Sequence, residues 1–290
     1  MPSQILLKLL KIFGHQDWIS IVIRDRIIRY FINPHTINSF EFETNYLGLK
    51  FKGNLNSVID FYIYFMEFEK GILFLMRDLL KEKPGCVFID IGANVGVHSL
   101  FMSNFCSQVH SFEPYQKVRE RLIHNMQLNQ INNIIVHDIG LGSKDEYLDL
   151  FVPIGAHQGE GSFLSEHRGD SKLIGKLKVV NGDSYISRLQ LNNIGLIKID
   201  VEGFEKDVLI GLENSLKVYR PFIVMEYSTT TKSKMSLKEL KEILPAGYIM
   251  KEINIDRKFC MFFNRMNYQL FDINFNKQAG INLLLLPAIK

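Results

Sequence analysis

Residues 87–96, Val-Phe-Ile-Asp-Ile-Gly-Ala-Asn-Val-Gly, constrain the fold of this chain more than any other segment. Their apolar start is typical of a strand that is buried on both faces of a parallel sheet. Gly92 and Gly96 bracket a tight turn, where the missing Cβ allows unusual backbone angles and lets a ligand approach the main chain. Because residues 97–102 have helical character, we predict a strand, a glycine loop and a helix, which place a ligand at the carboxyl edge of the sheet.

The glycine loop differs from the loops that bind phosphates. Asn94 stands where a dinucleotide fingerprint has its second glycine, and the spacing is Gly-x-x-x-Gly. The loop also lacks the Gly-Lys-Ser/Thr ending that holds a triphosphate. We therefore expect a nucleoside without phosphates, bound by the loop residues Gly92, Asn94 and Gly96.

Acidic side chains at the ends of three predicted strands are candidates for the other contacts with this nucleoside. Glu113 ends the strand 109–112, about twenty residues after the first glycine, where α/β folds place an acid that accepts from the ribose hydroxyls. Asp90 ends the first strand and is predicted to pair with an amino-acid ammonium. Asp138 follows the strand 134–136; it is either an acceptor for the adenine amine or an ordinary strand exit.

Three blocks of this chain resemble the FkbM-family methyltransferases: residues 88–99, 111–114 and 197–205. The resemblance runs from about Leu47 to Pro287. It implies S-adenosylmethionine as the cofactor and transfer of a methyl group to a hydroxyl, often on a sugar of a glycolipid, polysaccharide or natural product. The implied fold is the α/β, Rossmann-like fold of class I methyltransferases, with a seven-stranded, mostly parallel sheet flanked by helices.

Asp200 and Glu202 follow the buried strand 194–199, and a helix is predicted to begin at Gly203. An acid at a helix N-terminus is easily kept ionised, and an ionised acid can orient a hydroxyl or take its proton. We therefore predict Asp200 and Glu202 as catalytic residues. The structural alternative is that Asp200 caps the helix and Glu202 only complements its dipole.

Further candidates for the acceptor side are spread over the chain. His98 is predicted as a third catalytic residue, with local packing as the alternative, and His157 is another candidate base. Glu226, at the end of strand 222–226, lines the acceptor pocket or is a solvated strand end. Asp183 with Asp200 and Glu202 would supply oxygen ligands for Mg²⁺, but the spacing is not diagnostic, so a metal requirement stays open and no metal site is predicted.

The chain divides into an extension, residues 1–83, and a methyltransferase domain, residues 84–290. The extension shows helical patterns up to Pro34, a hairpin signal around residues 45–48 and helical spacing over 57–81. In the domain, residues 148–151 resemble an edge strand and residues 153–175 a polar loop over the site. The apolar runs at the C-terminus are predicted to complete the sheet: 247–250, 259–263 and 281–287.

Composition limits the location and the partners of the protein. Its cysteines, Cys86, Cys106 and Cys260, are too few and too scattered for a disulfide framework, so we expect a reducing, cytoplasmic location. Residues 5–13 are far shorter than the ~20 apolar residues that span a bilayer. We favour their packing on the domain or on a partner subunit over peripheral contact with the inner face of a membrane.

The expected acceptor is a carbohydrate or a glycolipid. The net charge of +3, spread along the chain, does not indicate nucleic acid. The rival functions are a nucleic-acid or other small-molecule methyltransferase, or a non-catalytic module that binds S-adenosylmethionine. The first usually carries an Asn/Asp-Pro-Pro-Tyr block, and the second would lack acids such as Asp200 and Glu202. The sequence does not predict the oligomeric state or the identity of the acceptor.

Overall fold

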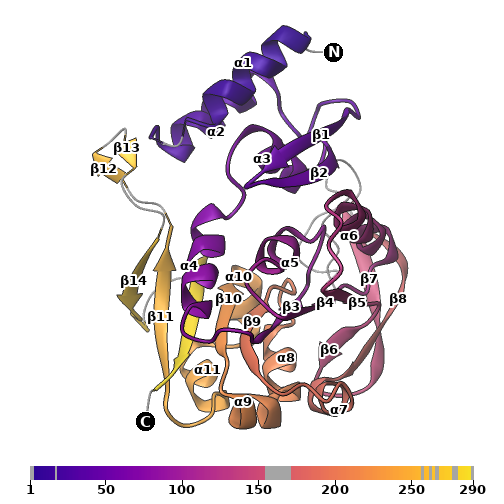
Figure 1. Cartoon of the computed structure of the whole chain (residues 1–290), viewed down its shortest axis with the longest axis vertical. Helices are drawn as coiled ribbons and strands as arrows, with labels where there is room; N and C mark the ends of the chain where they lie inside the picture. The colour runs from indigo at the N-terminus through magenta and orange to yellow at the C-terminus, as the bar shows by residue number, and fades with distance from the viewer. Residues whose placement is uncertain are drawn as a thin grey trace.

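The structure is a computed structural model, and it describes residues 3–16, 18–153, 171–255, 258–260, 263–264, 268–275 and 280–288. Its centre is an eight-stranded sheet in the order β14-β11-β15-β10-β9-β3-β4-β5, with residues 4–65 at one end of the molecule (Figure 1). The strands of this sheet are β3 (Val87–Ile91), β4 (Gln108–Phe112), β5 (Ile134–His137), β9 (Ile194–Ile199), β10 (Phe222–Tyr227), β11 (Tyr248–Asn254), β14 (Gln269–Asp272) and β15 (Ile281–Pro287).

Five neighbouring strands of the sheet, from β10 to β5, run parallel, whereas β15, β11 and β14 pair antiparallel. This mostly parallel sheet between helices confirms the predicted α/β fold of class I methyltransferases. The sheet has eight strands among the described residues instead of the predicted seven, because β14 adds a strand outside β11.

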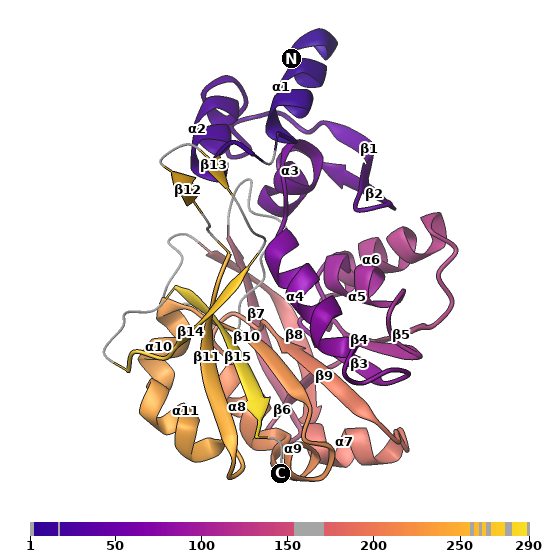
Figure 2. The same ribbon diagram turned by 60° about the vertical axis from the view of Figure 1, so that its left-hand side comes forward.

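The central strands are apolar because helices cover both faces of the sheet. Every residue of β3 and β9 is buried. One face packs against α7 (Gly182–Arg188), α8 (Glu205–Gly211), α9 (Glu213–Tyr219) and α11 (Leu237–Ile243), and α10 (Thr229–Lys234) follows β10. The other face packs against α4 (Lys70–Leu80), α5 (Val97–Met102) and α6 (Gln116–Leu128), as the second view shows (Figure 2).

The extension has an apolar cluster of its own, in which Leu7, Ile28 and Phe61 are buried. Its hairpin turns at Leu47 and Gly48, whose φ angles of 51° and 83° suit the tight turns that match the twist of paired strands. The predicted helices and hairpin are therefore present. The elements are α1 (Gln4–Gly14), α2 (Ile21–Phe31), β1 (Glu41–Tyr46), β2 (Leu49–Asn54) and α3 (Val58–Phe65).

The helical pattern over residues 57–81 is divided between two helices. Helix α3 ends at Phe65, α4 begins at Lys70, and Glu69 between them has a φ of 51°. The apolar spacing continues through the break, so the sequence did not reveal it. Helix α3 packs in the apolar cluster with α1 and α2, whereas α4, which the predicted boundary at residue 84 assigns to the extension, packs on the sheet.

A second, three-stranded sheet lies beside the main one, in the order β6-β8-β7. The predicted edge strand 148–151 belongs to this sheet, where it pairs with β8, and residues 171–175 of the predicted loop are part of β8. Residue 153 ends β7, and residues 154–170 of that loop, with His157, lie outside the described residues. The strands are β6 (Gly140–Gly142), β7 (Glu146–Pro153) and β8 (Ser171–Asn181).

The C-terminal runs were predicted only in part. Strands β11 and β15 join the main sheet as expected. The run 259–263 does not: β12 (Lys258–Cys260) and β13 (Phe263–Asn264) form a separate two-stranded sheet, so this prediction was wrong. No helix in the described part of the chain is long and apolar enough to span a membrane.

Candidate active site

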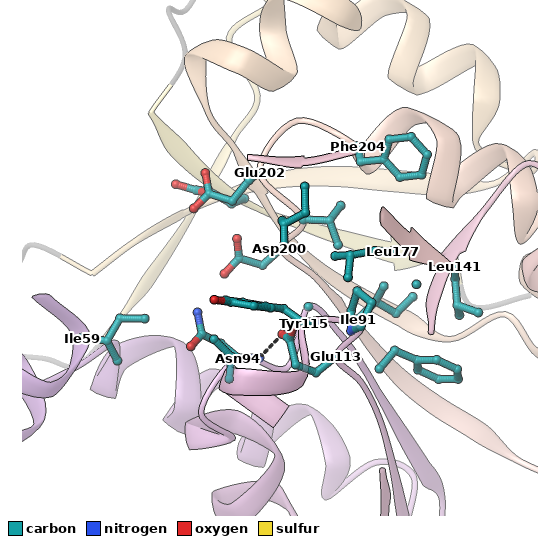
Figure 3. Close-up of a pocket in the computed structure, with 18 of the residues that line it drawn as sticks. Ile59, Ile91, Asn94, Glu113, Tyr115, Leu141, Leu177, Asp200, Glu202 and Phe204 are labelled. Carbon is teal, nitrogen blue, oxygen red and sulfur yellow. Dashed lines mark hydrogen bonds between the residues drawn. The ribbon is translucent and has the colours of Figure 1, made fainter. Parts of the chain in front are cut away.

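A cavity of about 270 Å³ lies at the carboxyl edge of the parallel strands (Figure 3). We call it the sheet-edge cavity. Its walls come from the strand ends, from helix α3 of the extension and from the second sheet. The apolar part includes Ile59, Phe68, Ile91, Phe112, Leu141 and Leu177. The polar part includes Glu69, Asn94, Glu113, Asp200, Glu202 and Glu226.

The glycine loop after β3 has the backbone angles that its spacing predicted. Gly92 has a φ of 80°, and a Cβ there would lie 1.9 Å from the carbonyl oxygen of Asp200. A Cβ on Gly96, with a φ of 89°, would lie 2.7 Å from Leu100 Cδ1. Gly92 and Asn94 line the cavity, whereas Gly96 packs behind it. The glycine loop can therefore pack against the backbone of Asp200 only because residue 92 is glycine.

Glu113 is held at the cavity wall by two backbone amides. Its Oε2 accepts a hydrogen bond from Asn94 N at 2.9 Å and its Oε1 accepts one from Tyr115 N at 3.0 Å. Burial raises the pKa of Glu113 to about 7, even though these amides and the Arg119 charge act in the opposite direction. Glu113, the residue predicted to bind the ribose, therefore lines the cavity in a fixed orientation (Figure 3).

Asp90 does not line this cavity. Its carboxylate is fully buried on the α5 side of the sheet, where Ser99 Oγ donates a hydrogen bond to Oδ2 at 2.6 Å. The reason is the alternation of side chains along β3, which sends Ile91 to the cavity and Asp90 to the other face. The predicted contact of Asp90 with an ammonium group of the ligand is therefore corrected: the structure gives this acid internal partners.

Asp138 also lies outside the sheet-edge cavity. It is exposed and lines a separate depression beside Lys178 and Arg188. Strand β5 ends at His137, whose ring stacks on Phe112, and the chain then turns so that Asp138 points to solvent. Of the two alternatives for Asp138, the structure matches the ordinary strand exit.

Asp200 and Glu202 both line the sheet-edge cavity, and their side chains lie across it from Asn94 (Figure 3). Helix α8 begins at Glu205, two residues later than predicted, and it lacks a side-chain cap. The Glu205 carboxylate accepts from the amides of the loop, Val201 N at 3.2 Å and Gly203 N at 3.0 Å. Asp200 therefore does not cap this helix, and the catalytic roles of Asp200 and Glu202 stay predictions.

Lys198 is a site residue that the sequence reasoning missed. Its Nζ lies 3.1 Å from Asp200 Oδ2 and 3.9 Å from Asp90 Oδ1, and the residue is only 5% exposed. Burial lowers the pKa of Lys198, but the charges of Asp200, Asp90 and Glu69 outweigh burial and raise it. The buried ammonium therefore stays charged and holds the Asp200 carboxylate. A lysine inside an otherwise apolar strand was the signal in the sequence.

His98 reaches the cavity only through Glu69. His98 is buried and does not line the cavity, and its Nε2 lies 2.9 Å from Glu69 Oε2. Burial would raise the pKa of Glu69, but the hydrogen bond with His98 and the charges of His98 and Lys198 lower it overall. The structure thus places an ionised acid from the extension at the cavity, with the predicted catalytic histidine behind it.

Glu226 lines the same cavity from the end of β10. Burial raises its pKa to about 8, and the negative charges of Asp200 and Glu202 add to this shift. The sheet-edge cavity thus holds acids of different proton affinity, which is typical of sites that move protons.

The described residues contain no group of three His, Cys, Asp or Glu side chains that could hold a metal ion. Asp183, which the sequence offered as a ligand for Mg²⁺, is used elsewhere. Its carboxylate accepts hydrogen bonds from Asn214 N at 2.8 Å and from Ser215 N at 2.7 Å, so it anchors the start of α9.

The sequence of this chain is similar to those of known methyltransferases. The family model of the methyltransferase FkbM domain matches residues 90–270. The hexuronic acid methyltransferase AglP of Haloferax volcanii is 27% identical over 187 residues, which cover 64% of this chain and 74% of that protein. The 2-O-methyltransferase NoeI of Sinorhizobium fredii is 26% identical over 183 residues, which cover 58% and 74%. A solved methyltransferase FkbM of Methylobacillus flagellatus aligns with a TM-score of 0.42 at 16% identity, over 69% of this chain and 43% of that one.

Proposed function

This chain belongs to the FkbM family of S-adenosylmethionine-dependent methyltransferases, and from this premise we propose that it methylates a sugar hydroxyl in the sheet-edge cavity. The observation that carries the proposal is the arrangement of Glu113 on one wall of the cavity and of Asp200 and Glu202 on the other. The first wall suits a nucleoside and the second suits a hydroxyl.

The residues of the first wall fit S-adenosylmethionine. A buried carboxylate such as Glu113, already oriented by two amides, is suited to accept hydrogen bonds from a ribose diol. Gly92 leaves the space that a Cβ would fill, so a ligand can approach the main chain there. Gly92, Asn94 and Glu113 would therefore hold the cofactor. When bound, it supplies a methyl group on a positively charged sulfur.

The residues of the second wall serve the acceptor. A sugar hydroxyl is a poor nucleophile at neutral pH. An ionised carboxylate that accepts its proton should therefore accelerate transfer by roughly 10²–10⁴-fold. Asp200 is the candidate for this role, because Lys198 holds its carboxylate at 3.1 Å beside the cavity. Glu202 and Glu226 lie in the same wall and would orient the hydroxyl.

The sugar class rests on two supports. One relative is named a hexuronic acid methyltransferase, which gives a sugar acid as its acceptor, and another is named a 2-O-methyltransferase, which gives an oxygen as the methylated atom. The cavity also carries the negative charges of Glu69, Asp200 and Glu202 on the acceptor side, which would repel the phosphates of a nucleic acid. Transfer to a nucleic acid is therefore the weaker alternative.

The test combines binding and turnover. Calorimetry with S-adenosylmethionine and its demethylated product should show binding, and labelled methyl groups should enter glycans from cells that lack this gene. Loss of the binding signal would remove the cofactor site, whereas binding with transfer only to RNA would replace the sugar by a nucleic acid. The same assay after exhaustive chelation tests the open question of Mg²⁺, and activity that survives removes the metal.

A second proposal concerns helix α1. Its inner side packs through Leu7 and Leu10, as we favoured, but Ile5, Leu9 and Ile12 are 73%, 59% and 63% exposed. An exposed apolar stripe on an amphipathic helix supports contact with a membrane surface, where glycolipid acceptors are found. A triple change of these three residues to serine should abolish sedimentation with liposomes. Equal sedimentation of the two proteins would contradict this contact.

A further inference from the structure

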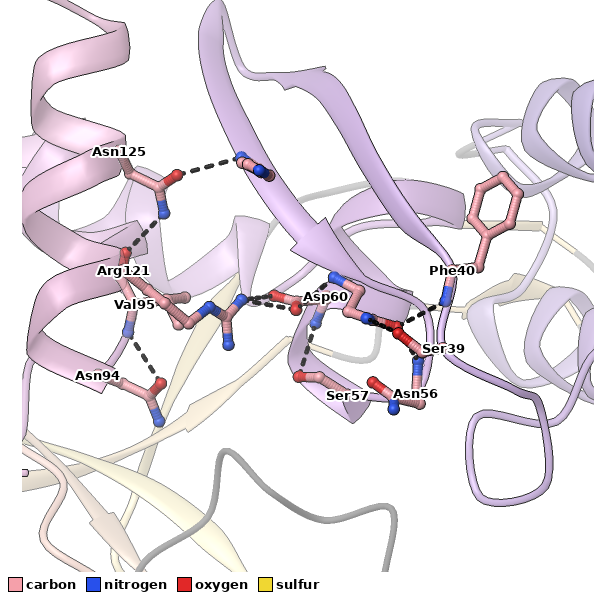
Figure 4. A network of polar contacts seen from close by, with 11 residues as sticks. Ser39, Phe40, Asn56, Ser57, Asp60, Asn94, Val95, Arg121 and Asn125 are labelled. Atoms are coloured by element: carbon pink, nitrogen blue, oxygen red, sulfur yellow. Dashed lines mark hydrogen bonds and ion pairs between the residues drawn. The ribbon is translucent and has the colours of Figure 1, made fainter. Parts of the chain in front are cut away.

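A second depression, of about 630 Å³, lies between the hairpin of the extension and helix α6 (Figure 4). We call it the outer depression. Its walls come from parts of the chain far apart in the sequence. The extension contributes Glu41, Lys52, Asn54, Asn56 and Asp60, and α6 contributes Lys117, Glu120, Arg121 and His124.

Residues that line the outer depression form a network of polar contacts. Arg121 Nη2 donates to both carboxylate oxygens of Asp60 at 2.6 Å, and Asp60 is only 2% exposed. Asn54 N donates to Asp60 Oδ2 at 2.8 Å, which fixes the same carboxylate to the hairpin. Arg121 Nη1 and Nε make no hydrogen bond with the described residues. A guanidinium that is held in place with donors to spare is suited to bind a ligand.

The chemistry of the lining selects one class of ligand. Three basic and three acidic side chains line the depression besides His124, so their formal charges balance. A balanced lining does not favour a polyanion. Among the described residues that line it, Val118 is the one large apolar side chain, and the other apolar surface belongs to the carbon atoms of polar residues, so the lining offers a lipid chain no apolar cluster. Carboxylates, amides, hydroxyls and a guanidinium together match a neutral ligand with many hydroxyls, and this describes a sugar.

The outer depression also adjoins the sheet-edge cavity. Val118 lines both of them. Along the start of α3, Ser57 and Asp60 line the outer depression, and Val58 and Ile59 line the cavity. We infer that the outer depression binds the sugar units next to the one that is methylated, so that the acceptor is an oligosaccharide or a longer glycan. This inference rests on the proposed function.

The experiment uses side chains that the fold does not need. The side chains of Asn56 and His124 line the depression and make no hydrogen bond within the described part of the chain. The double variant Asn56→Ala/His124→Ala therefore probes binding without breaking the network. Gln127→Ala is the matched control, because Gln127 is exposed on α6 but does not line the depression.

The acceptors are glycans from cells that lack this gene, partially hydrolysed and separated into monosaccharides and longer fractions. With the unchanged protein we expect kcat/KM to be at least about tenfold higher for the longer fractions. The double variant should lower kcat/KM for the longer fractions to the value for monosaccharides. Its kcat/KM for monosaccharides should equal that of the unchanged protein. Gln127→Ala should behave as the unchanged protein.

Each other outcome has its own meaning. Equal rates for all lengths, or rates for the longer fractions that the double variant does not change, would overturn the inference while the proposed function stands. Transfer into no sugar fraction, with the cofactor still bound in calorimetry, would overturn the sugar acceptor and this inference with it.

Discussion

The sheet-edge cavity and the outer depression are neighbours that differ in the kinds of residue that line them. Apolar side chains such as Phe112 and Leu177 surround a few acids in the cavity, whereas the described residues that line the outer depression are nearly all polar or charged. An apolar surround strengthens each charge inside it and shifts pKa values, as Glu113 and Glu226 show. This difference agrees with the two proposals made above, methyl transfer in the cavity and sugar binding in the outer depression.

The largest effect is expected in the sheet-edge cavity. Asp200→Asn should lower kcat by roughly 10²–10⁴-fold, because the proton acceptor for the hydroxyl is lost. The affinity for S-adenosylhomocysteine should stay the same. Steady-state kinetics and calorimetry measure the two quantities. Asp272→Asn, an exposed acid on β14, is the control. An unchanged kcat for Asp200→Asn would show that Asp200 is not the proton acceptor.

The next largest effect is expected on stability, in the outer depression. Arg121→Met leaves the buried Asp60 without its ion pair, so the free energy of unfolding should fall by about 3 kcal/mol. Lys52→Ala, which breaks an exposed pair with Glu41 in the same depression, should change it by less than about 0.5 kcal/mol. Urea denaturation measures both. Equal losses would mean that the buried pair of Arg121 and Asp60 contributes no more to stability than the exposed pair of Lys52 and Glu41.

A smaller effect is expected on cofactor binding. Glu113→Gln removes a charged acceptor whose hydrogen bonds are worth about 1.5–3 kcal/mol. The affinity for S-adenosylhomocysteine should therefore fall by roughly 10–100-fold in calorimetry. Asp138→Asn is the matched control. Because Asp138 lies outside the cavity, this variant should bind S-adenosylhomocysteine with unchanged affinity. A loss of affinity for Asp138→Asn would restore the predicted contact with adenine.

The smallest effect is a dependence of binding on pH. Burial raises the pKa of Glu113 to about 7, so the carboxylate is mostly protonated at pH 6 and mostly ionised at pH 8. Because the ionised form accepts from a ribose diol, affinity should rise by about tenfold over this range. The rise should be absent in Glu113→Gln. If the affinity of the unchanged protein does not depend on pH, the proposed contact between Glu113 and the ribose is wrong.

The sequence predicted those parts of the site that depend on local pattern. Gly92 and Gly96 were identified from their spacing, and the structure shows their positive φ angles. Glu113, Asp200 and Glu202 were identified because they follow apolar strands, and the carboxyl ends of parallel strands meet at one edge. Their roles in binding and catalysis stay predictions.

The residues that were placed wrongly or missed depend on long-range contacts. Asp90 also ends a strand, but its side chain falls on the other face, where Ser99 and Lys198 approach it. Glu69 reaches the cavity because the chain breaks between α3 and α4, a break that the apolar spacing hides. Helix and strand patterns carry no information on which distant side chains meet, so these contacts could not be derived from them.

The sequence by itself determined the α/β class, the acids that follow the parallel strands and the family of the protein, because these follow from periodicity and from short motifs. Only the tertiary structure decided that Lys198 lies against Asp200, that His98 stands behind Glu69, and that Arg121 and Asp60 join α6 to the extension. The physical reason is that burial and partners of a charged side chain are set by packing between elements distant in the chain, and packing is a property of the whole fold.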